Sequence, residues 1–177
     1  KGPTGWGVRT LDEREVRFNP MSYHNGSVWP HDNSLIALGL ARYGHTEAAM
    51  RLLTGLFDAA TAMPLTRLPE LFCGFARQPE EAPTLYPVAC SPQAWASGTP
   101  FGLLEAVMGM GIGRDSRSAR ATVLFRNPVL PAQLQRLEIQ GLRLGDEAID
   151  LELHRAVEDT GVLVKRRSRG VDVVIHK

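Results

Sequence analysis

Apolar residues recur at steps of three and four between residues 34 and 60, which is the spacing of one face of an α-helix. The first stripe stops before Gly44, a residue that suits the left-handed conformation that ends many helices. The second stripe covers residues 49–60, with Thr46 as its expected N-cap. Because only a few residues separate the stripes, the pattern predicts two helices that form an antiparallel hairpin.

A third stretch, residues 94–112, is apolar on almost every side, which predicts a helix buried around most of its circumference. Ser91 and Pro92 are expected to begin it, because serine caps helices and proline suits the first helical position. Pro100 is expected to kink it, since proline has no N–H for the helical hydrogen bond. Trp95 fits a core position in this helix better than a platform for a sugar ring.

After Gly113 the period changes from the helical one to an alternation of apolar and polar residues. Turn signals containing Gly and Asp divide this part into four expected strands, at residues 135–143, 148–155, 162–168 and 171–176. The pattern predicts a meander of four antiparallel strands with one buried face. The chain therefore divides into a helical part, residues 1–113, and a linker with a small antiparallel β appendage, residues 114–177.

Two long segments without either period, residues 1–33 and 64–92, precede helices, and loops of this length in compact domains are usually functional or disordered. The first ends in residues 23–33, which concentrate aromatic, titratable and hydrogen-bonding side chains and therefore predict the wall of a polar pocket. Two interpretations of Asp32 stay open. It either caps the helix expected to begin near Ser34, as Asn33 also could, or it contacts a substrate.

Glu70 is the single carboxylate in an otherwise bulky apolar part of the second long segment. It either points to solvent or is partly desolvated, and desolvation would raise its pKa toward the range used in acid–base catalysis. We expect both segments to face one cavity. Aromatic rings there suit the apolar faces of sugars, and Asn, His and Asp side chains suit their hydroxyl groups.

Composition narrows the class of protein. A net charge of +1 with 44% hydrophobic and 22% charged residues indicates a folded protein and argues against nucleic acid or an anionic membrane as main partner. No apolar run reaches the roughly 18 residues of a membrane span. Cys73 and Cys90 lack the spacing of a metal site and fit a reducing, cytoplasmic compartment, although a single disulfide also stays open. His24 and His31 are not a recognised metal pair.

Several motifs together resemble the carboxy-terminal part of bacterial amylo-α-1,6-glucosidase (glycogen debranching enzyme) type proteins, which belong with the trehalase-like six-hairpin glycosidases. The motifs are Gly5-Trp6-Gly7, Tyr23-His24-Asn25-Gly26-Ser27-Val28-Trp29-Pro30-His31-Asp32-Asn33, Leu68-Pro69-Glu70-Leu71-Phe72-Cys73-Gly74 and Ser91-Pro92-Gln93-Ala94-Trp95. The resemblance implies a mainly α fold, a partial (α/α)6 toroid followed by the small β region. It also implies inverting hydrolysis of an α-glucan or oligosaccharide without metal or organic cofactor.

By this resemblance Glu70 matches the general base, whereas the family's general acid is an aspartate on an earlier hairpin that this chain lacks. The chain is then expected to be an incomplete and inactive fragment, whose partner besides the substrate is the missing N-terminal part of the same polypeptide. Two alternatives remain: a hydrolase with Asp32 as the acid, and a non-catalytic carbohydrate-binding or assembly module. The expected substrate-binding residues are Tyr23, His24, Asn25, Trp29, His31 and Trp95.

Overall fold

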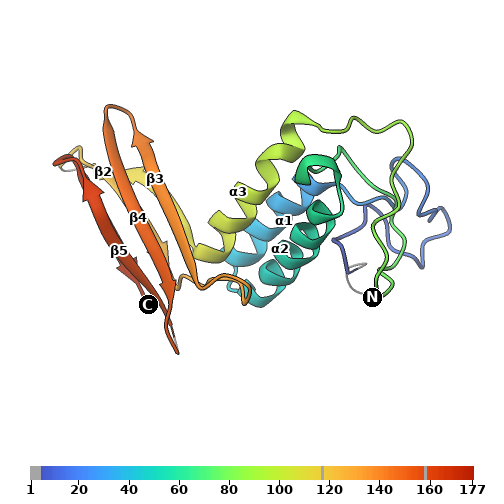
Figure 1. Ribbon diagram of the computed structural model, residues 1–177, viewed down its shortest axis with the longest axis horizontal. Coiled ribbons are helices and arrows are strands. Elements are labelled where there is room, and N and C mark those ends of the chain that lie inside the picture. The colour runs from blue at the N-terminus through green and yellow to red at the C-terminus, as the bar shows by residue number, and fades with distance from the viewer. Residues whose placement is uncertain (1–4, 117, 158) are drawn as a thin grey trace. The chain divides into compact units, whose positions relative to one another are not determined.

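The computed structural model describes residues 5–116, 118–157 and 159–177, in two compact units that divide between Ala106 and Val107. Figure 1 shows helices in the first unit and strands in the second. The elements, in chain order, are α1 (Pro30–Arg42), α2 (Thr46–Thr61), the short 3-10 helix η1 (Pro64–Thr66), α3 (Ala94–Met108), β1 (Met110–Arg114), β2 (Ala121–Arg126), β3 (Arg136–Leu144), β4 (Glu147–Arg155), β5 (Thr160–Arg167) and β6 (Val171–His176). None of the described helices is both long and apolar enough to cross a membrane.

The expected hairpin of α1 and α2 is present, and Gly44 joins the two helices with a φ of 83°. Helix α1 begins earlier than its apolar stripe, because Pro30 already has the φ that a first helical residue needs. Asp32 therefore lies within the first turn, and the prediction that it or Asn33 caps the helix is wrong. Thr46 is likewise the first residue of α2 and not its N-cap.

Gly55 lets the N-terminal segment lie directly on α2. A Cβ atom at this position would come within 2.6 Å of the Gly5 carbonyl oxygen and 2.8 Å of the Trp6 carbonyl oxygen. We expect Gly55→Ala to lower the free energy of unfolding by about 1–3 kcal/mol, because the backbone must shift. Gly39→Ala in α1 is the control, since nothing lies within 4 Å of its Cβ and alanine there should stabilise by about 0.5–1 kcal/mol. Urea unfolding of both variants checks this prediction, and a stabilised Gly55→Ala would contradict it.

Helix α3 begins and ends at other residues than predicted, and more of its surface is exposed than predicted. It begins at Ala94, after Ser91 and Pro92, and it ends at Met108 because Gly109 adopts a φ of 55° and the chain continues as β1. The side chain of Trp95 is 60% exposed and Phe101 is 74% exposed. The prediction that this helix is buried on most sides, with Trp95 in the core, is therefore wrong.

The strands form two three-stranded sheets and not one meander. Strands β3, β4 and β5 pair in antiparallel order as predicted, whereas β6 joins the other sheet, where it lies parallel to β2. Strand β1 pairs antiparallel with β2. The prediction placed β1 in a helix and did not include β2.

The fold class expected from the resemblance is wrong: helices and strands occupy similar shares of the described chain, so the protein is not mainly α, and three helices do not make a toroid. The physical reason lies in the second unit, where the strands bury their own core. Its fully buried side chains include Val123, Phe125, Ile149, Leu151 and Leu153.

Candidate active site

A short ladder of main-chain hydrogen bonds holds the two long loops of the first unit together. The Val28 N–H donates to the Phe72 carbonyl at 3.0 Å, and the Phe72 N–H donates back to Val28 at 3.1 Å. Arg9 and Leu85 extend this pairing on either side by isolated β-bridges. Glu70 lies two residues before Phe72, so the ladder brings it next to the polar segment of residues 23–33.

Each carboxylate oxygen of Glu70 accepts a hydrogen bond. The Tyr23 hydroxyl donates to Oε1 at 2.5 Å, and the Cys90 N–H donates to Oε2 at 3.2 Å. The Glu70 N–H in turn donates to the Cys90 carbonyl at 2.8 Å. The half-buried carboxylate is therefore held in one orientation by two groups, from two separate loops of the first unit.

These donors decide the protonation of Glu70. The Tyr23 hydroxyl, followed by the Cys90 N–H, holds the pKa of the Glu70 carboxyl below its ordinary value of 4.5, against an opposing effect of desolvation. Of the two alternatives left open for Glu70, the raised pKa that desolvation would cause is not found, because these donors outweigh desolvation. The same hydrogen bond raises the pKa of Tyr23 to about 12. At neutral pH the pair is thus a neutral phenol that donates a hydrogen bond to an ionised carboxylate.

We expect Tyr23→Phe to move the titration of the Glu70 carboxyl, followed by carboxyl ¹³C NMR, to higher pH. Removing the hydroxyl raises the pKa of Glu70 toward 4.5, so a base at this position loses its charge at a higher pH than in the wild type. Tyr43→Phe is the control, because Tyr43 is 80% exposed at the end of α1. An unmoved titration of Glu70 in Tyr23→Phe would contradict the effect assigned to the hydroxyl.

Aromatic rings extend from the Glu70 carboxylate in a continuous series. The ring of Tyr23 makes edge contacts with Tyr86, His24 and Trp29, at centroid distances of 5.6, 4.7 and 4.9 Å. Trp29 then meets the ring of His31 edge-on at 5.5 Å. His31 stacks on Trp95 at 4.3 Å with an angle of 19° between the planes. Loop residues, the first turn of α1 and the first turn of α3 thus contribute to one cluster.

Hydrogen bonds fix the rings near Tyr23. The indole N–H of Trp29 donates to the Ser27 hydroxyl at 2.9 Å, and that hydroxyl donates to the Tyr23 carbonyl at 2.6 Å. His31 is only 3% exposed, and its Nδ1 has no hydrogen-bond partner within the described residues. The Trp95 ring, by contrast, keeps much of its surface open. A ring with an open face is the group that a sugar can cover.

Two predicted site residues stand apart from the Glu70 carboxylate. Asn25 is exposed, and its main chain closes the loop through hydrogen bonds with Asn19 and with the Ser22 hydroxyl. The half-exposed Asp32 side chain lies 3.9 Å from His31 Nε2, measured to Oδ1. Neither residue contacts Glu70 in the described part of the chain.

Sequence reasoning assigned no role to Cys90 or Tyr86, and both contact the central pair. The available signal was their position in the same proline-rich loop as Glu70. Asn33 is structural, because its side chain bonds the Val8 backbone and the Trp29 carbonyl. Cys73 and Cys90 are free thiols. The described residues include no group of three or more His, Cys, Asp or Glu side chains placed to hold a metal ion.

Comparison with known proteins finds one related family. A family model described as the mannosylglycerate hydrolase MGH1-like glycoside hydrolase domain matches residues 1–67. No curated protein matches the chain. The matched residues contain the aromatic segment from Tyr23 to His31 and end before Glu70. This part of the chain is thus similar to a glycoside hydrolase domain, and the match does not extend to a debranching enzyme in particular.

Proposed function

We propose that this chain supplies part of a glycosidase active site, which hydrolyses α-glucosidic bonds with inversion, and that Glu70 is its general base. The observation that carries the proposal is the carboxylate itself, ionised and oriented by Tyr23 and Cys90 beside a series of aromatic rings. The similarity of residues 1–67 to a glycoside hydrolase domain supports the reaction class.

In such a reaction Glu70 removes a proton from a water molecule, whose oxygen attacks the anomeric carbon. A carboxylic acid on the opposite side gives its proton to the departing glycosidic oxygen, typically about 6.5–9.5 Å from the base. The resemblance to the six-hairpin glycosidases puts this acid on an earlier hairpin, so we assign it to a part of the native protein other than these 177 residues.

The substrate in this proposal is a glycogen-like glucan or an oligosaccharide, and the reaction needs no cofactor. Tyr23, Trp29 and Trp95 supply ring faces to the sugar, and His24, Asn25 and His31 supply polar groups to its hydroxyls. Hydrolysis of α-1,6 bonds, as in glycogen debranching, is the specificity that we propose from the motifs. A reducing, cytoplasmic location suits the two free thiols.

Proton NMR of the first product tests the stereochemistry. The full native protein should release β-glucose from an α-linked oligosaccharide, because attack by water from the opposite face inverts the anomeric carbon. Initial release of α-glucose would overturn the inverting assignment. Binding of the oligosaccharide without turnover in that protein, unaffected by Glu70→Gln, would instead favour a non-catalytic carbohydrate-binding or assembly module.

Asp32 is the second candidate for the acid, because its carboxylate lies against His31 of the ring cluster. α-Glucosyl fluoride separates the two assignments, since fluoride leaves without protonation. If Asp32 were the acid, Asp32→Asn would lose activity on the oligosaccharide and keep it on the fluoride. Under our assignment Asp32→Asn keeps most activity on both. Glu47→Gln, at an exposed carboxylate in the first turn of α2, is the control.

A further inference from the structure

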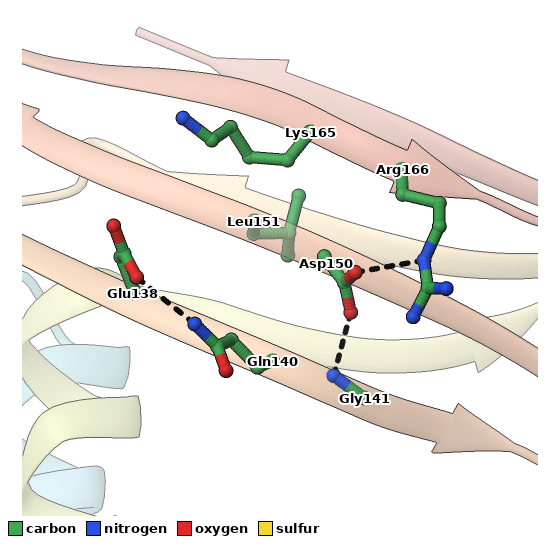
Figure 2. Close-up of a pocket in the computed structure, with 7 residues that line it drawn as sticks. All are labelled: Glu138, Gln140, Gly141, Asp150, Leu151, Lys165 and Arg166. Carbon is green, nitrogen blue, oxygen red and sulfur yellow. Dashed lines mark hydrogen bonds and ion pairs between the residues drawn. The ribbon is translucent and has the colours of Figure 1, made fainter.

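A hollow of about 250 Å³ lies on the sheet of β3, β4 and β5 (Figure 2), well away in sequence from Glu70. Most of the residues that line it have polar or charged side chains. The lining residues are Glu138, Gln140, Gly141, Asp150, Leu151, Lys165 and Arg166. The proposed hydrolytic site uses none of them.

Two irregularities in the sheet flank Asp150 and shape this hollow. The register between β3 and β4 shifts between Ile139 and Leu142, and the register between β4 and β5 shifts beside Asp150. Gly141, at the first shift, has a φ of 63°, which few other residues adopt readily. Both outer strands thus carry extra residues at the same level of the sheet, and β-bulges of this kind often re-aim side chains at binding sites.

The Asp150 carboxylate ties the two irregular strands together. Its Oδ1 accepts from the Gly141 N–H at 2.6 Å, and its Oδ2 accepts from the Arg166 Nε–H at 2.8 Å, as Figure 2 shows. These bonds hold the pKa of Asp150 below its ordinary value, with the Gly141 N–H as the largest cause. The Asp150 carboxylate at the floor of the hollow is therefore held in place, and each of its two oxygens already accepts a hydrogen bond.

Hydrogen-bonding groups remain free on both sides of this floor. Arg166 uses only Nε, so both terminal nitrogens of its guanidinium lack a partner in the described chain, and its side chain is 77% exposed. On β3, the amide N–H of Gln140 donates to Glu138 at 3.0 Å, which leaves the Gln140 amide oxygen as an acceptor. One wall of the hollow thus presents donors and the other presents acceptors.

We propose that this hollow binds the hydroxyl groups of an uncharged saccharide, as a second carbohydrate site separate from Glu70. A sugar hydroxyl both donates and accepts, so neighbouring hydroxyls can bond the Arg166 wall and the Gln140 wall at once. The lining carboxylates, Glu138 and Asp150, balance the lining cations, Lys165 and Arg166, which disfavours a charged ligand. The volume is below the roughly 300–1,000 Å³ of pockets for drug-sized ligands, and it therefore suits a single sugar unit.

Titration of the 177-residue chain with maltotriose, followed by backbone amide NMR, tests this proposal. Glu70→Gln is included throughout, so that the readout does not depend on the proposed base. Maltotriose should shift the amides of Gly141, Asp150 and Arg166 with saturation, and Arg166→Gln should weaken that binding by roughly tenfold or more, since it removes charged hydrogen bonds. Arg143→Gln is the matched control, because it removes the same charge from an exposed position of β3 outside the hollow.

Absence of saturable shifts at these amides would overturn the proposal, as would equal weakening by Arg166→Gln and Arg143→Gln. Shifts produced by inorganic phosphate and not by maltotriose would overturn the assignment of an uncharged ligand. If the spectrum of Arg166→Gln shows loss of the fold, Gln140→Ala replaces it, with the same expected weakening. The readout does not involve turnover, so its failure is distinguishable from failure of the proposed hydrolytic function.

Discussion

We expect Glu70→Gln to lower the kcat of the full native protein on an α-linked oligosaccharide by about 10²–10⁴-fold. The amide of glutamine has nearly the shape of the carboxylate but cannot take a proton from the attacking water. Binding of the oligosaccharide should change far less, because the rings from Tyr23 to Trp95 stay in place. Steady-state kinetics and calorimetric binding on the same samples check both parts of this result.

Azide provides the sharper version of this test. In Glu70→Ala the missing side chain leaves room for a small anion that attacks without a base, so sodium azide should restore turnover and yield the β-glucosyl azide. Glu81→Gln is the control, because Glu81 is an exposed carboxylate of the same loop. A Glu70→Gln protein with wild-type kcat, or rescue without formation of the azide product, would contradict the assignment of the base.

Phe72→Ala should lower the free energy of unfolding by about 3–5 kcal/mol, the largest loss of stability that we expect from a single substitution. Phe72 is fully buried, and its backbone is the central rung between Val28 and Leu85. The change leaves a cavity where the two loops of the site meet. Urea unfolding, followed by tryptophan fluorescence, measures the loss.

Phe57→Ala is the matched control for this prediction, since Phe57 on α2 is 53% exposed. Its loss should stay well below that of Phe72→Ala, because most of the Phe57 ring already contacts water. Similar losses in both variants would show that the loop core does not stabilise this unit. A selective loss in Phe72→Ala would agree with loops that act as a packed scaffold for Glu70.

Periodicity alone predicts the elements whose contacts are local. The α1–α2 hairpin follows from the spacing of apolar residues and from Gly44, and the β3–β4–β5 meander follows from the alternation of apolar and polar residues. Segment composition also predicts that the polar stretch before α1 and Glu70 belong to one site. The hydrogen bond between Tyr23 and Glu70 joins those two segments.

Contacts between residues far apart in the chain decide the remaining features. Strand β6 alternates apolar and polar residues like any half-buried strand, so its sequence does not name its neighbour. It lies parallel to β2, a strand some fifty residues earlier in the chain. The sign of the pKa shift of Glu70 comes from Tyr23 and Cys90, whereas its neighbours in sequence are apolar and suggest the opposite sign. The exposure of the Trp95 ring likewise depends on how much of the surface of α3 is covered by the rest of the first unit.

The same distinction explains the error in fold class. The motifs around Trp29 and Glu70 predict a hydrolytic site, and the similarity to a glycoside hydrolase domain covers residues 1–67, which contain Trp29 but not Glu70. The proportions of helix and strand depend on every segment, including β1 and β2, whose short apolar runs carry no clear period. Amino-acid order therefore specifies local elements, while partners for strands, exposure of side chains and protonation follow from long-range packing.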